Sequence, residues 1–365
     1  MKCIECGSKT PGGRARTTGR CGACHHPYAF LGVADPHQLN DSLFAAAIER
    51  VSERGTHWFT ERQLWHEVLR RLPAAPKLGC ATAGAMALVA PILLMMGALG
   101  GTTGTSTVAT NQLPFDAFRE RCLPRWIDVH GLPSRLVDRT MIEREAPVPP
   151  AEVSAYSFDR ALIVESADVA AMFVANRFHF ENNCAILAAD GGFPAGRTFE
   201  TVLGMLRRNP GLVVHVLHDA SPEGMAVASG LRAASWFPDT GIRIVDLGLT
   251  PAQAKAARIP ETNGLPLGDD VSLPLPEDEA GSLRQGSRWD LEALRPSRLL
   301  SVAWRGFART AEMASDERWN DDGIWLAGYG WGPGLWLVDD GWHAHDHWAG
   351  SNAAMLDAGA SDSFG

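Results

Sequence analysis

Two Cys-x-x-Cys pairs at the N-terminus place the tightest constraint on the fold of this chain. The pairs are Cys3 with Cys6 and Cys21 with Cys24, and fourteen residues separate them. Four thiolates at this spacing suit a tetrahedral zinc site between two facing knuckles, in which Gly7 and Gly22 let backbone amides turn toward sulfur. Four sulfur ligands leave no open position for water, so such a zinc ion is structural. We therefore expect residues 1–30 to form a zinc ribbon.

The residues around the ribbon leave its partner open. Arg14, Arg16 and Arg20 could contact nucleic acid, but ribbons of this kind serve equally often to dock proteins. His25 and His26 are spare metal ligands, for which a surface position is the more common outcome.

The remaining composition favours a reducing compartment and excludes a uniformly basic protein. Cys80, Cys122 and Cys184 are isolated and form no disulfide framework, and the N-terminus lacks a secretory signal. We expect an intracellular location. With 365 residues, 45% hydrophobic residues and a net charge of −9, the chain has room for two or three domains, and any nucleic-acid contact needs a local basic patch.

Residues 40–75 have the periodicity of two helices. Asn40, Asp41 and Ser42 are candidate caps for the first helix, and Thr60 can cap the second.

A long uncharged segment follows at 78–107. Gly79–Leu99 is apolar and about long enough to cross a bilayer, which predicts a transmembrane or re-entrant segment and association with a membrane. Pro91 and many small residues would also suit a buried helix or a loop. Arg70 and Arg71 before the segment favour a cytoplasmic N-terminus.

The second half of the chain is expected to be an α/β domain. Residues 108–150 form a helical linker that ends in a Pro-rich stretch. Residues 158–260 alternate short β-branched runs with amphipathic runs, which predicts a parallel sheet with strands at 161–165, 184–189, 212–218 and 242–246. Residues 261–365 are loop-rich and then Trp-rich, which indicates short β-strands.

Two of these strands end on a carboxylate, Glu165 and Asp219. The carboxyl ends of parallel strands meet at one edge of a sheet, so the two side chains could share a divalent cation, Mg²⁺ or Mn²⁺. Each could instead cap the helix that follows it.

Three strings in this region resemble the Toprim domain of the topoisomerase VI A subunit and of the related meiotic double-strand-break transesterase. They are Leu162-Ile-Val-Glu165, then Asp190-Gly-Gly-Phe-Pro194 with its following helix, and Asp219-Ala-Ser-Pro-Glu-Gly224 with the later Asp246-Leu-Gly-Leu-Thr-Pro251. The resemblance implies that Glu165 and Asp219 are metal ligands.

The chain also departs from that family. Ser221 stands where the family has a second aspartate, so the metal set would be Glu165, Asp219 and Ser221, with Glu223 assisting catalysis. Upstream, Thr60-Glu-Arg-Gln-Leu-Trp65-His66 resembles the winged-helix segment that carries the family's nucleophilic tyrosine, and His66 occupies the tyrosine position.

Two functions remain open. The first is a divergent Toprim protein that binds nucleic acid or acts as a metal-dependent phosphodiesterase or nuclease, without tyrosyl transesterification. The second is a non-catalytic, membrane-associated scaffold that keeps a degenerate Toprim fold to bind a partner.

Overall fold

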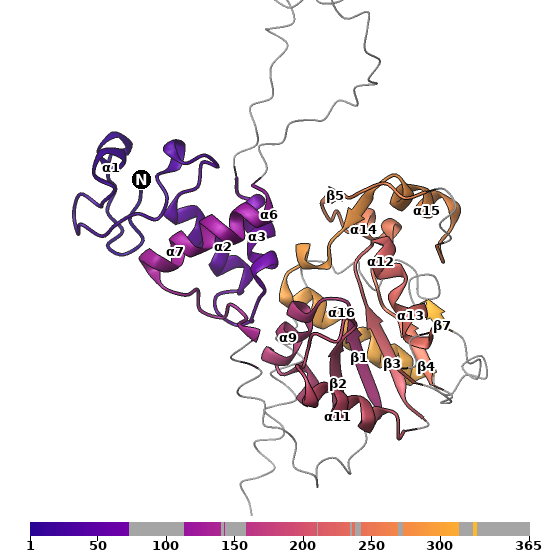
Figure 1. Cartoon of the computed structure of the whole chain (residues 1–365). Coiled ribbons are helices and arrows are strands. Elements are labelled where there is room, and N and C mark those ends of the chain that lie inside the picture. The colour runs from indigo at the N-terminus through magenta and orange to yellow at the C-terminus, as the bar shows by residue number, and fades with distance from the viewer. Residues whose placement is uncertain are drawn as a thin grey trace, which may run out of the picture. The chain divides into compact units, whose positions relative to one another are not determined.

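The chain forms two compact units, which are described separately. The computed structural model describes residues 1–72, 113–139, 142, 158–209, 211–233, 236–237, 242–268, 273–313 and 324–326 (Figure 1). One unit comprises Met1–Arg50 and Leu64–Pro133, and the other comprises Val51–Gln63 and Ser134–Gly365.

Three predicted segments lie wholly or largely outside the described residues. These are the apolar segment 78–107, the Pro-rich end of the linker at 146–150, and most of the Trp-rich stretch after residue 313. Within the described ranges, no helix combines the length and the apolar character that crossing a bilayer requires.

The two helices expected within 40–75 are present. Helix α2 (Asp41–Val51) starts after Asn40, whose side-chain oxygen accepts a hydrogen bond from the Leu43 amide at 2.9 Å. Helix α3 (Glu61–Leu69) starts after Thr60, whose hydroxyl accepts from the Gln63 amide at 3.1 Å. Asn40, one of the three candidate caps of the first helix, and Thr60 are therefore confirmed as caps, whereas the winged-helix assignment stays a prediction.

The first unit is built on a core of aromatic side chains. It contains α1 (Gly12–Thr18), η1 (Gly32–Ala34), α2, and a continuous helical stretch of α6 (Phe115–Ala117), the π-helical turn η3 (Phe118–Cys122) and α7 (Leu123–His130). The Phe44 ring stacks on Trp126, with the ring centroids 4.7 Å apart, and on Phe118, with the centroids 5.9 Å apart. These contacts fix α7 against α2.

A parallel sheet forms the centre of the second unit, in the strand order β2-β1-β3-β4-β7. The strands are β1 (Arg160–Val164), β2 (Cys184–Ala188), β3 (Val213–Leu217), β4 (Arg243–Asp246) and β7 (Ile324–Leu326). The first four match the predicted strands to within one residue at each end, because short buried apolar runs mark them clearly. The α/β class with a parallel sheet is confirmed.

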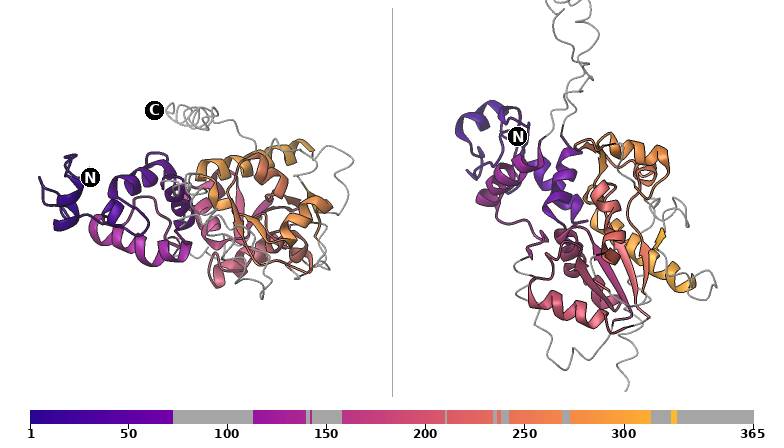
Figure 2. Two further views of the ribbon diagram at one scale, coloured as in Figure 1. Left: turned by 90° about the horizontal axis from the view of Figure 1, so that it is seen from above. Right: turned by 45° about the vertical axis from the view of Figure 1, so that its right-hand side comes forward.

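Helices cover both faces of this sheet (Figure 2). Side chains alternate along each strand, so Leu162 and Val164 of β1 enter one core while Ala161 and Ile163 enter the other. The first core is closed by α9 (Ala167–Ala175), α10 (Phe178–Glu181) and α16 (Pro296–Met313), and the second by α11 (Arg197–Leu206) and α13 (Val227–Ala233).

The region after 260 is more regular than the sequence indicates. It contains a two-stranded antiparallel sheet of β5 (Glu261–Asn263) and β6 (Ser287–Trp289). Helix α15 (Glu277–Arg284) lies between these strands in the chain, and η5 (Leu291–Ala293) follows them. Trp289 also forms an antiparallel bridge with Ala220, just beyond the end of β3.

Candidate functional site

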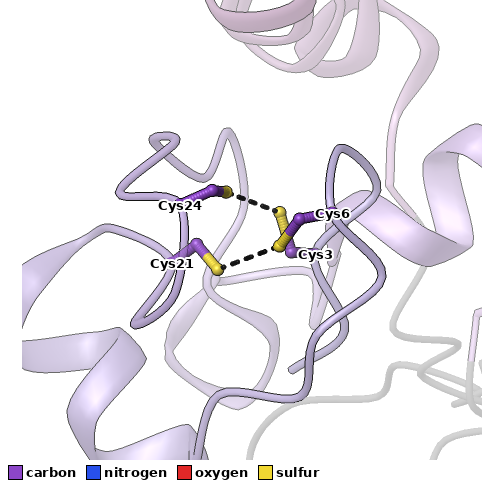
Figure 3. Close-up of side chains that lie close together, drawn as sticks. All are labelled: Cys3, Cys6, Cys21 and Cys24. Atoms are coloured by element: carbon purple, nitrogen blue, oxygen red, sulfur yellow. Dashed lines mark hydrogen bonds between the residues drawn. The ribbon is translucent and has the colours of Figure 1, made fainter.

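The four N-terminal cysteines come together as predicted (Figure 3). The Sγ atoms of Cys3 and Cys24 lie 3.7 Å apart, and those of Cys6 and Cys21 also lie 3.7 Å apart. All four sulfur atoms lie within 4.8 Å of one another. Sulfur atoms bound tetrahedrally to zinc at about 2.3 Å are about 3.8 Å apart, so the donor set fits this ion.

Hydrogen-bond donors surround one of these sulfur atoms. The Ser8 hydroxyl lies 3.2 Å from Cys21 Sγ, and the Ala23 amide donates to the same atom at 3.4 Å. The Ser8 contact is the main reason that the pKa of Cys21 falls to about 4. The His26 amide lowers the pKa of Cys24, but neighbouring sulfur atoms and burial outweigh it and raise that pKa to about 12. A bound cation would stabilise the adjacent sulfur atoms as thiolates, because it offsets the repulsion between their negative charges.

In both knuckles the residue after the second cysteine has a positive φ, but this residue is a glycine only in the first knuckle. Gly7 follows Cys6 with a φ of +71°, and His25 follows Cys24 with a φ of +59°. Gly22 is not among the glycines with positive φ, but the amide of the next residue, Ala23, donates to Cys21 Sγ at 3.4 Å. In the second knuckle the left-handed conformation falls on His25.

A second candidate site lies at the carboxyl edge of the parallel sheet. The chain leaves β1 for β2 on one side and returns to β3 on the other, so β1 and β3 flank the point where the strand order reverses. Ligands of open α/β sheets commonly bind at such a point. Glu165 follows β1 and Asp219 follows β3. The Asp219 amide donates to Glu165 Oε2 at 2.8 Å, so the structure brings these two predicted residues together.

Two further carboxylates, which the sequence analysis missed, join this edge. The bridge between Ala220 and Trp289 brings Asp290 and Glu292 beside Asp219, whose Oδ1 accepts from the Leu291 amide at 2.7 Å. The only sequence signal is the short string Trp289-Asp-Leu-Glu292. It lies about seventy residues beyond Asp219, and no periodicity connects the two segments.

The carboxylates interact strongly because they are buried together. Burial raises the pKa of Glu165, and burial with the charges of Asp290 and Glu165 raises the pKa of Asp219 well above its ordinary value. Burial and Asp290 also raise the pKa of Glu292 to about 8. The raised pKa values mean that the protein alone does not stabilise all of these groups as carboxylates.

Two cationic groups border this cluster. Arg62 Nη1 lies 3.2 Å from Asp290 Oδ2, and Arg62 Nε lies 3.6 Å from Glu292 Oε2. His218 Nε2 lies 2.9 Å from Asp246 Oδ1, and His218 Nδ1 lies 2.7 Å from the Asp219 carbonyl oxygen. Burial alone would lower the pKa of His218, but Asp246 raises it. With both ring nitrogens facing oxygen atoms, His218 is stabilised as an imidazolium.

The other predicted residues of this site have different surroundings. The Ser221 hydroxyl accepts from the Gly224 amide at 2.9 Å and so caps the short helix α12 (Pro222–Met225). The Glu223 side chain is 70% exposed and lies 3.9 Å from Arg288. Within the described part of the chain, no three carboxylates of this edge have oxygen atoms within 4.8 Å of one another.

The residue at the expected nucleophile position is packed inside the first unit. His66 is buried, and its ring lies against Trp65 with the centroids 4.5 Å apart. Tyr28, the one tyrosine among the described residues, is also buried and donates to Thr10 beside the cysteine cluster.

In comparisons with known proteins, no protein-family model, no curated protein and no solved structure matches this chain.

Proposed function

We propose that this protein is a divergent Toprim-type protein that binds nucleic acid or hydrolyses phosphodiesters with a divalent metal ion, Mg²⁺ or Mn²⁺. One observation carries the proposal: Glu165, Asp219, Asp290 and Glu292 gather at the reversal point of a parallel sheet. The pKa values of Glu165, Asp219 and Glu292 are raised although Arg62 and His218 lie nearby, and a divalent cation would stabilise such a cluster.

In this proposal each group has a defined role. Glu165 and Asp219 hold the ion, which when bound stabilises phosphate charge. The His218 imidazolium fixes the Asp219 main chain from behind, since its Nδ1 faces the Asp219 carbonyl oxygen at 2.7 Å. Arg62 orients Asp290 and Glu292 through its two guanidinium contacts.

The proposed chemistry is hydrolytic. His66 is buried and stands in place of the nucleophilic tyrosine, so we expect no covalent attachment to DNA. Ser221 is a neutral ligand in place of a carboxylate and already caps α12, so the ion is bound weakly and Mn²⁺ supports activity better than Mg²⁺.

We further propose that the cysteine cluster binds one structural zinc ion through Cys3, Cys6, Cys21 and Cys24. The ribbon around it would dock nucleic acid or a protein partner.

The test is cleavage of supercoiled and single-stranded DNA by the purified chain in Mg²⁺ or Mn²⁺. Wild type is compared with Glu165→Gln and Asp219→Asn, and Mn²⁺ binding is measured in parallel by electron paramagnetic resonance. Glu200→Gln is the matched control, because Glu200 is an exposed glutamate on α11. We expect both site variants to lose cleavage and Mn²⁺ binding, and the control to keep both.

Two results would count against this function. Equal cleavage by wild type and both site variants would mean that the acidic edge is not the catalytic site. A covalent protein–DNA adduct would contradict the loss of the nucleophile.

One observation favours the alternative, a membrane-associated scaffold that uses the fold to bind a partner. The carboxylates at the sheet edge do not form a three-ligand set as tight as the cysteines do, among the residues that the structure describes. A scaffold would show neither cleavage nor Mn²⁺ binding. It would sediment with membranes, and deletion of 79–107 would release it.

A further inference from the structure

A second group of metal-ligand side chains lies in the first unit, separate from the cysteines. Glu5, His26 and His130 each offer one ligand atom, and these three atoms lie within 4.8 Å of one another. His26 Nε2 lies 3.3 Å from His130 Nδ1. Two nitrogen atoms bound tetrahedrally to one zinc ion at about 2.0–2.1 Å are about 3.3 Å apart, so the pair already has ligand spacing.

His130 is held rigidly from the side opposite to His26. Its Nε2 lies 2.9 Å from Asp41 Oδ2, and its side chain is only 4% exposed. The ring also packs on Trp126 with the centroids 4.3 Å apart. When Nε2 donates to Asp41, the lone pair of Nδ1 faces His26, which is the tautomer that metal binding needs. A carboxylate behind a ligating histidine is the usual outer partner in metal sites.

Asp41 is itself fixed as an acceptor. Its Oδ1 accepts from the Phe30 amide at 2.8 Å, and its Oδ2 accepts from the Ala29 amide at 3.2 Å. Three donors therefore hold this buried carboxylate, and its orientation does not depend on a metal ion.

The other two side chains come from the two cysteine knuckles. Glu5 lies between Cys3 and Cys6, and His26 follows Cys24 by two positions. The His26 ring stacks on His130 with the centroids 5.1 Å apart and the planes at 30°. The packing of both knuckles beside the end of α7 thus assembles residues that are 104 positions apart in sequence.

A simple hydrogen-bond chain from His26 through His130 to Asp41 would also explain the spacing of the two rings. Such a chain gives no reason for a Glu5 carboxylate oxygen within 4.8 Å of one ring nitrogen of each histidine. Two imidazoles and a carboxylate are instead a common ligand set of three-ligand zinc sites.

We propose that Glu5, His26 and His130 bind one divalent transition-metal ion of the zinc class, with Asp41 as the outer partner of His130. Three protein ligands leave a fourth position for water or a small ligand, unlike the cysteine cluster, in which four sulfur atoms fill the coordination sphere. This site is independent of the acidic edge of the sheet.

The experiment is metal counting on the full-length chain. Protein equilibrated with excess Zn²⁺ and then passed over a desalting column is analysed by elemental analysis. A Co²⁺ titration is followed by absorption spectroscopy. We expect two zinc ions per chain in wild type, and two cobalt spectra, of which only one carries a thiolate-to-cobalt charge-transfer band.

Two ligand variants and one control decide the assignment. Glu5→Gln changes an exposed side chain, and His26→Ala changes a half-buried one, so both should fold. Each should lose the second ion and the cobalt spectrum that lacks the thiolate band, with at least a tenfold weaker affinity, and keep the first. His25→Asn alters the adjacent histidine and should keep both ions.

One zinc ion per wild-type chain at saturation would overturn the proposal. Retention of the second ion in either ligand variant, or its loss in His25→Asn, would overturn the ligand set.

Discussion

His215 is a base buried inside the main sheet. It lies on β3, with its ring against Phe307 at 4.2 Å and Nε2 3.1 Å from Thr310 Oγ1. Burial lowers the pKa of His215 from 6.5 to about 3. The unfolded chain therefore takes up a proton at this residue between about pH 6.5 and pH 3, and the folded chain does not. The contribution of His215 to the free energy of unfolding is therefore fully present at neutral pH, and it falls as the pH drops through that window.

Replacement of His215 by Gln should reduce the sensitivity of the fold to acid. Gln keeps a donor for Thr310 but takes up no proton, so the free energy of unfolding should fall by about 2 kcal/mol less than in wild type between pH 7 and pH 5. Urea unfolding across this range measures the difference. The control His25→Asn removes an exposed histidine and should retain the wild-type slope. Equal slopes in wild type and His215→Gln would show that His215 is protonated in the folded state.

Gly224 is required where α12 meets the acidic edge. A Cβ at this position would overlap the Asp219 carbonyl oxygen and lie 2.9 Å from Glu165 Oε2. In contrast, a Cβ at Gly230 on α13 would meet nothing within 4 Å.

Gly224→Ala should destabilise the protein by about 2 kcal/mol or more, because backbone must move to relieve the overlap. Gly230→Ala should stabilise it by about 0.5–1 kcal/mol, because alanine is the better residue inside an exposed helix. Thermal unfolding of the two variants measures both values. A destabilisation of equal size in both would mean that the site geometry is not the cause.

These residues show what a sequence can indicate about a site. The strand-end positions of Glu165 and Asp219 were visible, because each follows a buried β-branched run. The proximity of Asp290 and Glu292 was not, because it depends on the single bridge between Ala220 and Trp289.

At the level of elements, two helices begin with the same capping box. Thr60 and Gln63 exchange hydrogen bonds at the start of α3, and Thr250 and Gln253 do so at the start of α14 (Pro251–Ala256). The first box differs in one respect, because the Thr60 hydroxyl also donates to the buried Glu292 carboxylate.

The two caps allow a matched comparison. Thr250→Ala should cost about 1 kcal/mol, the usual value of a lost cap. Thr60→Ala should cost about 1–3 kcal/mol more, because it also removes a hydrogen bond from a buried carboxylate and raises the pKa of Glu292 further. Urea unfolding at pH 7 measures both, and Thr60→Ser should restore stability. Equal costs for the two alanine variants would contradict a special role for Thr60.

The elements themselves followed from the sequence where the periodicity was clear. The runs at β1 to β4 are short, apolar and β-branched, and both capping threonines precede amphipathic segments. The π-helical turn Phe118–Cys122 could not be predicted, because it differs from an α-helix only in its hydrogen-bond register. The strand order likewise depends on long-range packing that periodicity does not encode.

At the scale of the whole molecule, the proposed zinc ion should stabilise residues 1–30 and not the main sheet. The apolar cluster beside the four cysteines consists of Cys3, Cys21 and Tyr28, with Met1 and Leu31 against it, which is too small a core to hold residues 1–30 in place without metal. The sheet instead carries two extensive apolar cores.

Chelation of zinc, or the change Cys6→Ser, should therefore unfold residues 1–30 and leave the sheet intact. Hydrogen exchange followed by mass spectrometry should show peptides from 1–30 losing protection, while peptides of β1 to β4 keep theirs. Cys122→Ser is the control, since Cys122 is buried in η3 away from the four-cysteine set. Loss of protection throughout the sheet would show that the zinc site supports the entire fold.

The strand order also has a consequence for biosynthesis. Strand β4 ends at Asp246, but its partner β7 begins only at Ile324. At ~5–20 residues per second, a ribosome needs several seconds to supply β7 after β4 is complete. Until then the growing chain exposes one row of unpaired amide and carbonyl groups along β4, the kind of edge on which nascent chains aggregate. Chaperones that shield newly made proteins should therefore bind this chain most strongly while the segment between β4 and β7 is being translated.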